Sequence, residues 1–559
     1  MRFSFFFTLP ILLLCLLFSA APAPGAGPGQ TLQNTLTQLL ENQPTADLDM
    51  ITTGTAPATI DRALLSLYLK KSIQPLWITN NRPDARALAL LRTLEESILD
   101  GLNPDDYKVA EILTLWPRED AASLARLDVL LTLALGRYVA DMREGSADPC
   151  LLNPKLFAAA RDHEVDILQV VNEALLSEDL GVFLKNQAPS HEAYRGLRKA
   201  LADYRTLQQD GGWKTIAEGP TIKPGMSDPR IPLIVERLVK TGELEPDAHS
   251  GRQYDQKLTE AVRTFQHRFL LEPDGVIGKK TLAAMNIPLS QLIKSIILNM
   301  ERWRWLPHRL DGKRIFVNIA GFQLFGATDE QVEITMPVIV GKVYHKTPVF
   351  TGSLRYLEIN PFWNIPNSIA VNEMVPHMQK DPDYLSKKNI RIFEGWQENA
   401  PEIDPAAIDW QTIGKGIRRY RLRQDPGPDN ALGRIKFIFP NVNNIYLHDT
   451  PAHALFLKTT RNFSHGCIRV MRPLELGEYL LEGNKKPLKV AQLQKLVESN
   501  KRKVILLDKQ LPVHILYRTV RASAATGELF FYPDVYQRDA LLAKALFARK
   551  PLSQCRYVQ

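Results

Sequence analysis

The sequence predicts an α+β protein of several domains: an all-α scaffold, a small three-helix unit and a mainly-β domain with an inserted cap. Apolar residues recur at helical steps between Leu32 and Leu207, and a compact helical unit follows. Beyond Trp305 the period changes to two, as in half-buried strands. The chain of 559 residues is too long for a single hydrophobic core, since a domain has about 150 residues. With 45% hydrophobic and 23% charged residues, the composition excludes wholesale disorder.

The N-terminal region has helical spacing but no chemical cluster. No stretch of it gathers His, Cys or carboxylates at catalytic intervals, so support or partner binding is its expected role. The repeats that define its helices are Leu88, Leu91, Leu94 and Ile98, then Leu124, Leu127, Leu131, Leu135 and Tyr138.

The three-helix unit has the clearest periodicity in the chain. Leu258, Val262, Phe265 and Phe269 place one apolar stripe on one helix face. From these residues alone the unit is a small bundle of unspecified purpose. The stretch YDQKLTEAVRTFQHRFLLEPDGVIGKKTLAAMNIP resembles a peptidoglycan-binding domain, which implies a wall-binding role.

Period-two runs define the C-terminal domain. They are Ile315-Val317-Ile319, Val332-Ile334-Met336 and Ile435-Phe437-Phe439. Residues 364–430 interrupt them with a Pro-, Trp- and charge-rich insert, too long for a plain connection and therefore a candidate cap. A strand pair, 513–520 with 528–532, and a helix from Arg538 are expected near the end.

The N-terminus has the layout of a secretory signal. An apolar run from Phe3 to Phe18 leads into small residues up to Ala26. The run is shorter than the about 20 residues that cross a bilayer comfortably, which favours cleavage. Pro22 and Pro24 lie close to the expected cleavage sites, so an uncleaved inner-membrane anchor is the alternative interpretation.

Export makes the cysteines informative. Without the signal, Cys150, Cys467 and Cys555 remain, so at least one thiol lacks an intramolecular partner. Whether Cys150 and Cys555 pair stays open.

The net charge is a weak guide to partners. Lys+Arg 69 against Asp+Glu 61 gives +8, which suits an anionic polymer or simply a basic surface. The sequence has no Lys/Arg block or aromatic-basic repeat, which argues against a dedicated nucleic-acid binder.

The chemistry is concentrated in NIYLHDTPAHALFLKTTRNFSHGCIRVMRPLELGEYLL, residues 444–481. A cysteine accepts an acyl group as thiolate, so it needs a nearby base or cation. Tyr446 and His448 share a strand face, and a hairpin-like return would bring Cys467 beside His448. The Ser464-His465-Gly466 turn allows backbone amides to face an oxyanion, and Arg469 adds a positive charge.

Two other interpretations compete for these residues. A buried cysteine is often a small apolar group, and a histidine is often a satisfied polar residue. His448, His453, His465 and Cys467 are also conceivable zinc ligands, but the sequence has no HExxH or CxxC pair.

The segment resembles the signature of YkuD-type L,D-transpeptidases, an HD or HG pair before an [ST]-x-G-C-[IV]-R box. EINPFWNIPNSIA, DPDYLSKKNIRIFEGW, QDPGPDNALGRIKFIFPN, YLHDTPAHALF and RNFSHGCIRV occur in order. With QPLWITNNRPDARALALLRTLEESILDGLNPDDY, they resemble the large periplasmic YcbB-like group, which carries a scaffold domain, a peptidoglycan-binding domain and a capped catalytic domain.

The resemblance implies residue roles. Cys467 would be the nucleophile, His448 the general base, and Asp449 would orient that imidazole through its backbone carbonyl. His465, Gly466 and Arg469 would support the oxyanion or thiolate. The candidate substrate contacts are Trp363, Tyr446 and Ser464. The aromatic residues of the insert, Trp363, Tyr384 and Trp396, could instead simply pack within the cap. The resemblance implies neither a metal nor an organic cofactor.

The implied activity is ping-pong acyl transfer between peptidoglycan stem peptides. A cysteine thioester forms with release of D-alanine, and an amine of a neighbouring stem resolves it as a 3→3 cross-link. An L,D-carboxypeptidase or amidase and a non-catalytic wall anchor are the alternatives. Partners other than peptidoglycan would dock on the scaffold, and the expected location is periplasmic. The predicted units are a signal at 1–26, a scaffold at 27–222, a peptidoglycan-binding domain at 229–288, a catalytic domain at 300–520 and a tail at 521–559.

Overall fold

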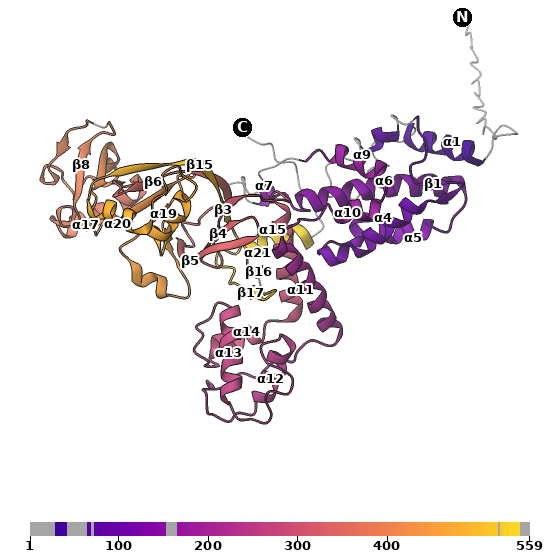
Figure 1. Cartoon of the computed structure of the whole chain (residues 1–559), viewed down its shortest axis with the longest axis horizontal. Coiled ribbons are helices and arrows are strands. Elements are labelled where there is room, and N and C mark those ends of the chain that lie inside the picture. The colour runs from indigo at the N-terminus through magenta and orange to yellow at the C-terminus, as the bar shows by residue number, and fades with distance from the viewer. Residues whose placement is uncertain are drawn as a thin grey trace, which may run out of the picture.

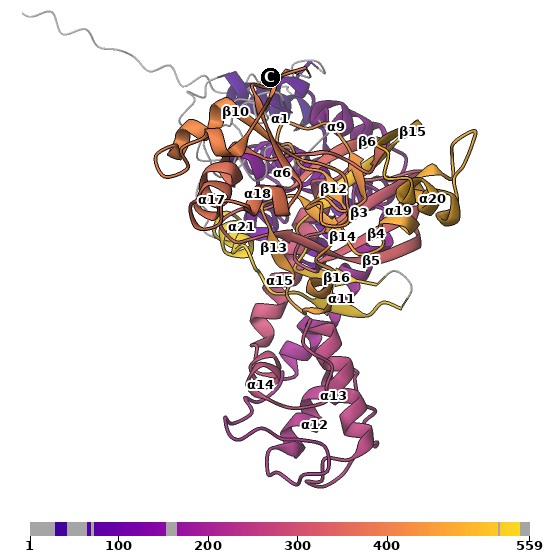
Figure 2. The ribbon, with the colours of Figure 1, turned by 90° about the vertical axis from the view of Figure 1, so that its left-hand side faces the viewer.

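A computed structural model describes residues 28–41, 64–68, 72–152, 165–397, 399–523 and 526–547. Three lobes meet around one helix, α15 (Leu289–Arg304): a helical lobe, a β-rich lobe and a smaller unit that projects from both (Figures 1 and 2). The predicted α+β class is therefore confirmed. The predicted signal segment and Cys555 lie outside the described residues.

The helical lobe is built around one long buried helix, α6. Aspartates cap α4, α6, α9 and α10 by accepting a backbone N–H of the first turn, which fixes where these helices begin. The elements of the lobe are α1 (Pro28–Glu41), β1 (Ile78–Thr79), β2 (Arg82–Pro83), α4 (Ala85–Glu96), η1 (Ser97–Asp100), η2 (Pro104–Tyr107), α5 (Val109–Leu115), α6 (Ala121–Glu144), α7 (Pro149–Leu152), α9 (Ile167–Leu176) and α10 (Leu180–Lys185).

The small unit holds three helices, α12 (Ile231–Lys240), α13 (Gln256–Arg268) and α14 (Lys279–Met285). The predicted stripe of α13 is buried, with Leu258, Val262 and Phe265 at its centre. Its core continues into α11 (Glu192–Gln209) and α15, so α11 packs with this unit rather than with the core around α6.

The β lobe contains a nine-stranded sheet in the order β13-β5-β14-β12-β11-β6-β15-β3-β4 within the described residues. Because β4 also pairs with β5, the sheet closes on itself. Its strands are β3 (Lys313–Asn318), β4 (Gln323–Thr328), β5 (Gln331–Gly341), β6 (Phe350–Ile359), β11 (Ile435–Ile438), β12 (Leu447–His448), β13 (Asn462–Ser464), β14 (Ile468–Val470) and β15 (Lys503–Leu516). The period-two runs predicted from the sequence thus form β3, β5 and β11.

Two helices and a short turn complete the β lobe. α19 (Pro473–Leu481) and α20 (Val490–Glu498) pack against its core, and η6 (His453–Leu457) lies between β12 and β13. Residues 513–516 end the long strand β15 and pair with β3 and β6. The predicted pairing with 528–532 is therefore made by a separate strand, β16 (Val520–Ala522), with β17 (Leu529–Phe531).

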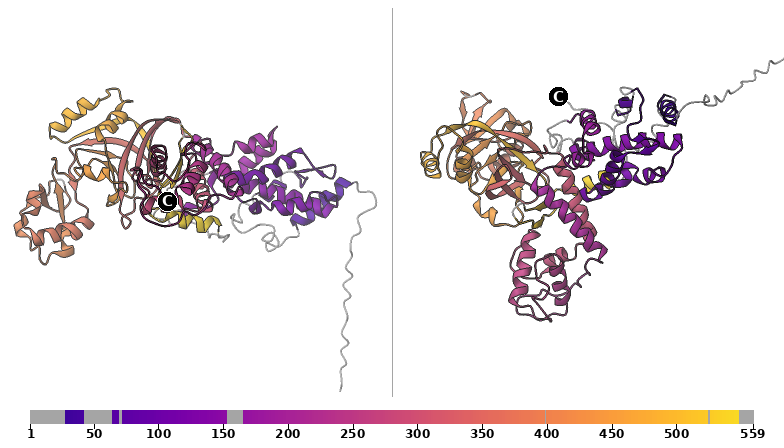
Figure 3. Two further views of the ribbon diagram at one scale, coloured as in Figure 1. Left: turned by 90° about the horizontal axis from the view of Figure 1, so that it is seen from below. Right: turned by 45° about the vertical axis from the view of Figure 1, so that its right-hand side comes forward.

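The insert between β6 and β11 forms a body with its own core, here called the cap. Its four-stranded sheet has the order β7-β10-β8-β9, and Figure 3 shows it at the far end of the molecule from the helical lobe. The cap elements are β7 (Trp363–Asn364), α16 (Asn367–Ile369), the π-helical turn η3 (Ala370–Met374), α17 (Val375–Lys380), α18 (Tyr384–Lys387), β8 (Ile390–Glu394), β9 (Glu402–Ile403), η4 (Pro405–Ala407), η5 (Gly414–Arg419) and β10 (Tyr420–Gln424).

The C-terminal segment returns to the centre of the molecule. Helix α21 (Arg538–Phe547) packs against α15 and α7, and Arg302 on α15 forms an ion pair with Asp539 at 2.7 Å. Among the described residues, no single helix is long and apolar enough to cross a membrane, although the bent pair α14 and α15 passes by length and composition.

Candidate active site

The site is set by parallel pairing of two short strands, β12 and β14. Leu447 pairs with Ile468, and His448 pairs with Arg469. Since side chains two residues apart share a sheet face, Tyr446 and His448 lie on the same face as Cys467 and Arg469. The strands run parallel, so the expectation of a hairpin-like return was wrong. A crossover through η6 and β13 joins them instead.

His448 is buried and has a defined tautomer. Its Nδ1 lies 2.5 Å from the backbone oxygen of Asp449. A carbonyl oxygen can only accept, so Nδ1 carries the proton and Nε2 is left as an acceptor. Burial first, and the positive charge of Arg469 second, lower the pKa of His448 to about 3. The imidazole is therefore neutral at physiological pH.

The Asp449 carboxylate contacts the segment at residues 433 and 434. Its Oδ2 accepts the backbone N–H of Arg434 at 2.8 Å. Gly433 lies against it at φ +62°, where an added Cβ would approach the carboxyl carbon to 2.4 Å. The backbone carbonyl of Asp449, rather than its side chain, thus contacts His448.

Cys467 is a free, half-buried cysteine with a polarised surrounding. Its Sγ lies 3.9 Å from the backbone oxygen of Asn444. Burial raises the pKa of the Cys467 thiol, while hydrogen bonds from Tyr446 and the charges of Lys436 and Arg469 act in the opposite direction. The thiol of Cys467 and the imidazole of His448, which share a sheet face, are therefore both neutral at rest.

The turn before Cys467 is fixed by hydrogen bonds. Ser464 Oγ donates to the backbone oxygen of Cys467 at 2.5 Å and accepts from Gly466 N at 3.1 Å. Thr347 Oγ1 donates to the Gly466 oxygen at 2.8 Å. Gly466 adopts φ +122°, which L-side chains rarely do. Its amide is engaged by Ser464, so its role here is conformational.

His465 faces the cap. Its Nε2 lies 2.6 Å from Glu373 Oε1 on η3, and its ring centroid lies 5.1 Å from that of His345. Burial lowers the pKa of His465, and Glu373 opposes that shift.

Sequence reasoning missed two contributors, Lys436 and Glu373. Lys436 pairs with His448 across β11 and β12, and its Nζ lies 4.1 Å from the Tyr446 ring centroid. A charged residue between the apolar Ile435 and Phe437 was the available signal for Lys436. Nothing local to Glu373 points to His465, which is far away in the sequence.

The remaining predicted residues lie as follows. Trp363 is half-buried against the cap core, in line with the packing alternative, whereas Trp396 is 53% exposed. Tyr384 stacks on His377 with centroids 4.4 Å apart. Over the described ranges, no group of three or more His, Cys, Asp or Glu is arranged to hold a metal ion.

Known protein families match this architecture in three places. Residues 62–201 match a scaffold domain, 227–285 a putative peptidoglycan binding domain and 312–490 an L,D-transpeptidase catalytic domain. The chain thus carries an L,D-transpeptidase catalytic domain of the YkuD type. More particularly, a scaffold domain and a peptidoglycan-binding domain precede that catalytic domain, in the order that the motifs predicted.

One curated protein and one solved structure are similar to parts of this chain. A putative L,D-transpeptidase of Haemophilus influenzae is 34% identical over 250 residues, which are 45% of this chain and 49% of that protein. The match therefore spans about half the length of this relative. A crystal structure of the L,D-transpeptidase (residues 123–326) from Xylanimonas cellulosilytica covers 54% of this chain and 99% of its own, at 14% identity. The TM-score of this match is 0.17.

Proposed function

We propose that this protein is a cysteine-dependent peptidoglycan L,D-transpeptidase that forms 3→3 cross-links in the periplasm. The observation that carries the proposal is the parallel register of β12 and β14, which puts Cys467 and His448 on one sheet face. A second observation supports it. Because His448 Nδ1 donates its proton to the Asp449 carbonyl, Nε2 carries the lone pair that would accept the thiol proton.

In the first half-reaction, Cys467 attacks the carbonyl that links a diaminopimelate L-centre to the terminal D-alanine. Because thiol and imidazole are both neutral at rest, the S–H proton passes to His448 Nε2 as the C–S bond forms. His448 then returns this proton to the departing amine. The C–N bond breaks, D-alanine leaves, and a thioester on Cys467 remains.

The charges around the sulfur favour this step. Tyr446, Lys436 and Arg469 each stabilise negative charge on Cys467. The electrostatic attraction between these groups and the sulfur increases as negative charge develops, because the effective dielectric of a half-buried site is lower than that of water. Arg469, paired with His448 in register, also disfavours a protonated imidazole and so speeds return of the proton.

In the second half-reaction, a side-chain amine of a neighbouring stem attacks the thioester. Its proton passes to His448, the C–S bond breaks, and the thiol is regenerated as the new amide forms. Water in place of the amine would give carboxypeptidase activity. The His465–Glu373 contact supports a cap that closes over the site and disfavours water, since it joins the catalytic turn to the cap.

The peptidoglycan-binding unit contacts the segment that leads to the catalytic turn. Thr459 Oγ1, five residues before Ser464, donates to Glu272 Oε2 of that unit at 3.2 Å. A cleft of about 700 Å³ lies between α13, α14 and the segments that hold Thr459 and Phe531. This contact supports one continuous substrate path from the binding unit to Cys467.

The test is reaction of the purified chain with diaminopimelate-containing disaccharide tetrapeptides. Mass spectrometry should find cross-linked dimers, released D-alanine and a thioester adduct on the Cys467 peptide. Cys467→Ala should give none of these, while still binding sacculi. Shortened stems without dimers would instead identify a carboxypeptidase, and unchanged products from Cys467→Ala would exclude cysteine catalysis.

A further inference from the structure

A second cavity lies away from Cys467, where the first residues of α11 and the end of α15 meet β3, β4, β5 and β16. Its volume is about 680 Å³, within the range of small-ligand sites. Trp303, Phe316 and Phe325 line it with aromatic surface, and Arg314, Arg518 and Arg521 line it with positive charge. None of the residues assigned to the peptidoglycan reaction lines it.

Arg518 is the unusual member of this lining. It is 8% exposed, and its guanidinium carbon lies 3.2 Å from the ring centroid of Trp303. The Trp303 ring also contacts His191, with centroids 4.7 Å apart. Neither Nε nor Nη2 of Arg518 has a hydrogen-bond partner in the described part of the chain. A buried charge without a counter-charge is costly, and stacking on Trp303 offsets only part of that cost.

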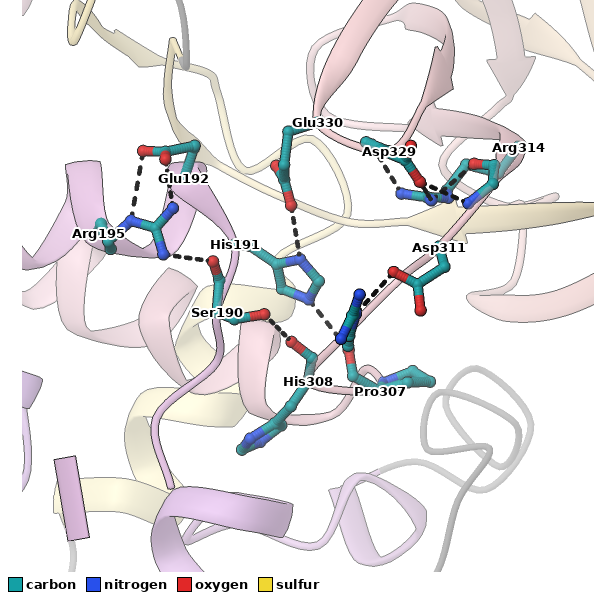
Figure 4. Close-up of polar contacts among 12 residues, drawn as sticks. Ser190, His191, Glu192, Arg195, Pro307, His308, Asp311, Arg314, Asp329 and Glu330 are labelled. Atoms are coloured by element: carbon teal, nitrogen blue, oxygen red, sulfur yellow. Dashed lines mark hydrogen bonds and ion pairs between the residues drawn. The ribbon is translucent and has the colours of Figure 1, made fainter. Parts of the chain in front are cut away.

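The acidic residues of the cavity already have other partners. Glu330 Oε1 lies 3.4 Å from His191 Nδ1, and Asp329 Oδ1 accepts the backbone N–H of Gly312 at 2.7 Å (Figure 4). Glu192 forms an ion pair with Arg195 (Figure 4). These carboxylates therefore leave Arg518 without compensation.

The other two arginines differ in their freedom. Arg314 donates to the backbone oxygens of Asp329 and Gly312 at 2.9 and 2.7 Å, so its hydrogen-bonding groups are largely engaged. Arg521 donates to the Tyr532 hydroxyl at 3.2 Å and lies over the Phe530 ring at 4.3 Å. Positive charge at Arg518 and Arg521 thus flanks an aromatic wall.

We propose that this cavity binds a small amphipathic anion, with a carboxylate or phosphate group at Arg518 and an apolar body against Trp303, Phe316 and Phe325. The anion supplies the counter-charge that the protein lacks, because the Arg518 side chain lines the cavity and attracts an anionic group there. The apolar body removes the aromatic wall from water.

The experiment is calorimetric titration of the full chain with four ligands of equal chain length: octanoate, octyl phosphate, octanol and octyltrimethylammonium. One of the two anions should bind about tenfold or more tightly than octanol, because charge-assisted contacts discriminate by at least that much. The stronger anion identifies the headgroup as carboxylate or phosphate. Equal affinity for octanol and both anions, or no saturable binding, would overturn the proposal.

Two variants assign the effect to the cavity. Arg518→Met keeps much of the side-chain volume and should abolish the preference for the anion while octanol still binds. Val332→Asp changes a 53% exposed lining residue, so the fold is not at risk, and should weaken anion binding and favour octyltrimethylammonium. Arg309→Gln, which removes an exposed guanidinium paired with Asp311, should change nothing. Anion preference that survives both Arg518→Met and Val332→Asp would contradict the proposal.

Discussion

His465 Nε2 and Glu373 Oε1 lie 2.6 Å apart, which ties the residue two before Cys467 to the cap. Glu373 sits on η3, a π-helical turn, and such turns are frequent at functional sites. One contact thus joins two parts of the chain with separate cores, the catalytic sheet and the cap.

Glu373→Ala should release the cap. Both side chains are partly exposed, at 33% and 41%, so the contact is worth at most about 1 kcal/mol, or about a two- to fivefold effect. The rate at which Cys467 is alkylated in the folded protein, read by mass spectrometry of the peptide that contains it, should rise by that factor. The increase should be larger for a bulky maleimide than for iodoacetamide. Glu394→Ala, on the exposed face of β8, is the matched control. A rate unchanged by Glu373→Ala would show that this contact does not limit access.

The pH dependence of Cys467 follows from its burial. Its folded-state pKa is raised, so the thiolate forms only above the ordinary pKa of cysteine. Iodoacetamide alkylation of Cys467 should keep rising through about pH 9. No inflection from His448 should occur between about pH 5 and 8, because the pKa of His448 lies near 3. A plateau below neutral pH would indicate a resting thiolate–imidazolium pair instead.

Tyr446→Phe should move that profile to higher pH. The Tyr446 hydroxyl hydrogen-bonds to Cys467 and lowers the pKa of the thiol, so its loss raises that pKa further. A hydrogen bond to a charged group is worth about 1.5 kcal/mol or more, which predicts about tenfold slower alkylation at neutral pH. Tyr420→Phe, in the cap, serves as control. An unshifted pH profile would show that the Tyr446 hydroxyl does not stabilise the thiolate.

Asp449→Asn and Gly433→Ala should distinguish the role of the Asp449 backbone carbonyl from the role of its carboxylate. Asn keeps an oxygen that accepts from Arg434 N and keeps the carbonyl that binds His448, so turnover should stay within about fivefold. Gly433→Ala would drive a Cβ to 2.4 Å from the Asp449 carboxyl carbon and displace the segment. Its kcat should fall while thermal melting shows a folded protein. A large loss in Asp449→Asn would assign the carboxylate a direct role.

Asp128→Ala should destabilise the helical lobe. Asp128 is fully buried and accepts from the Tyr68 hydroxyl at 2.6 Å and from Trp77 N at 2.8 Å. Truncation leaves the backbone N–H groups of Leu76 and Trp77 without their acceptor, which predicts a loss of about 3 kcal/mol in the free energy of unfolding, measured by urea titration. Glu119→Ala, which breaks an exposed ion pair with Arg82, should cost under about 0.5 kcal/mol. Equal effects of the two substitutions would contradict the assignment.

Local patterns were sufficient to predict much of the fold. The steps of three and four that contain Leu91 and Leu131 became α4 and α6, and the alternation around Val317 and Phe437 became β3 and β11. These predictions succeeded because periodicity reports which side of one element is buried. The pairing partners of the last strands were not predictable in this way, since residues 513–516 joined β3 and β6 instead of 528–532.

The sequence by itself determined the class of protein and the chemical types at its site, because the box around Cys467 and His448 is a local string. Only the tertiary structure decided that β12 and β14 run parallel, that Lys436 stands beside His448, and that Glu373 reaches His465. The physical reason is that strand register and contacts between separate cores depend on the packing of distant segments. The ionisation of Cys467 was decided in the same way, since burial depends on what surrounds the sulfur and not on its neighbours in the chain.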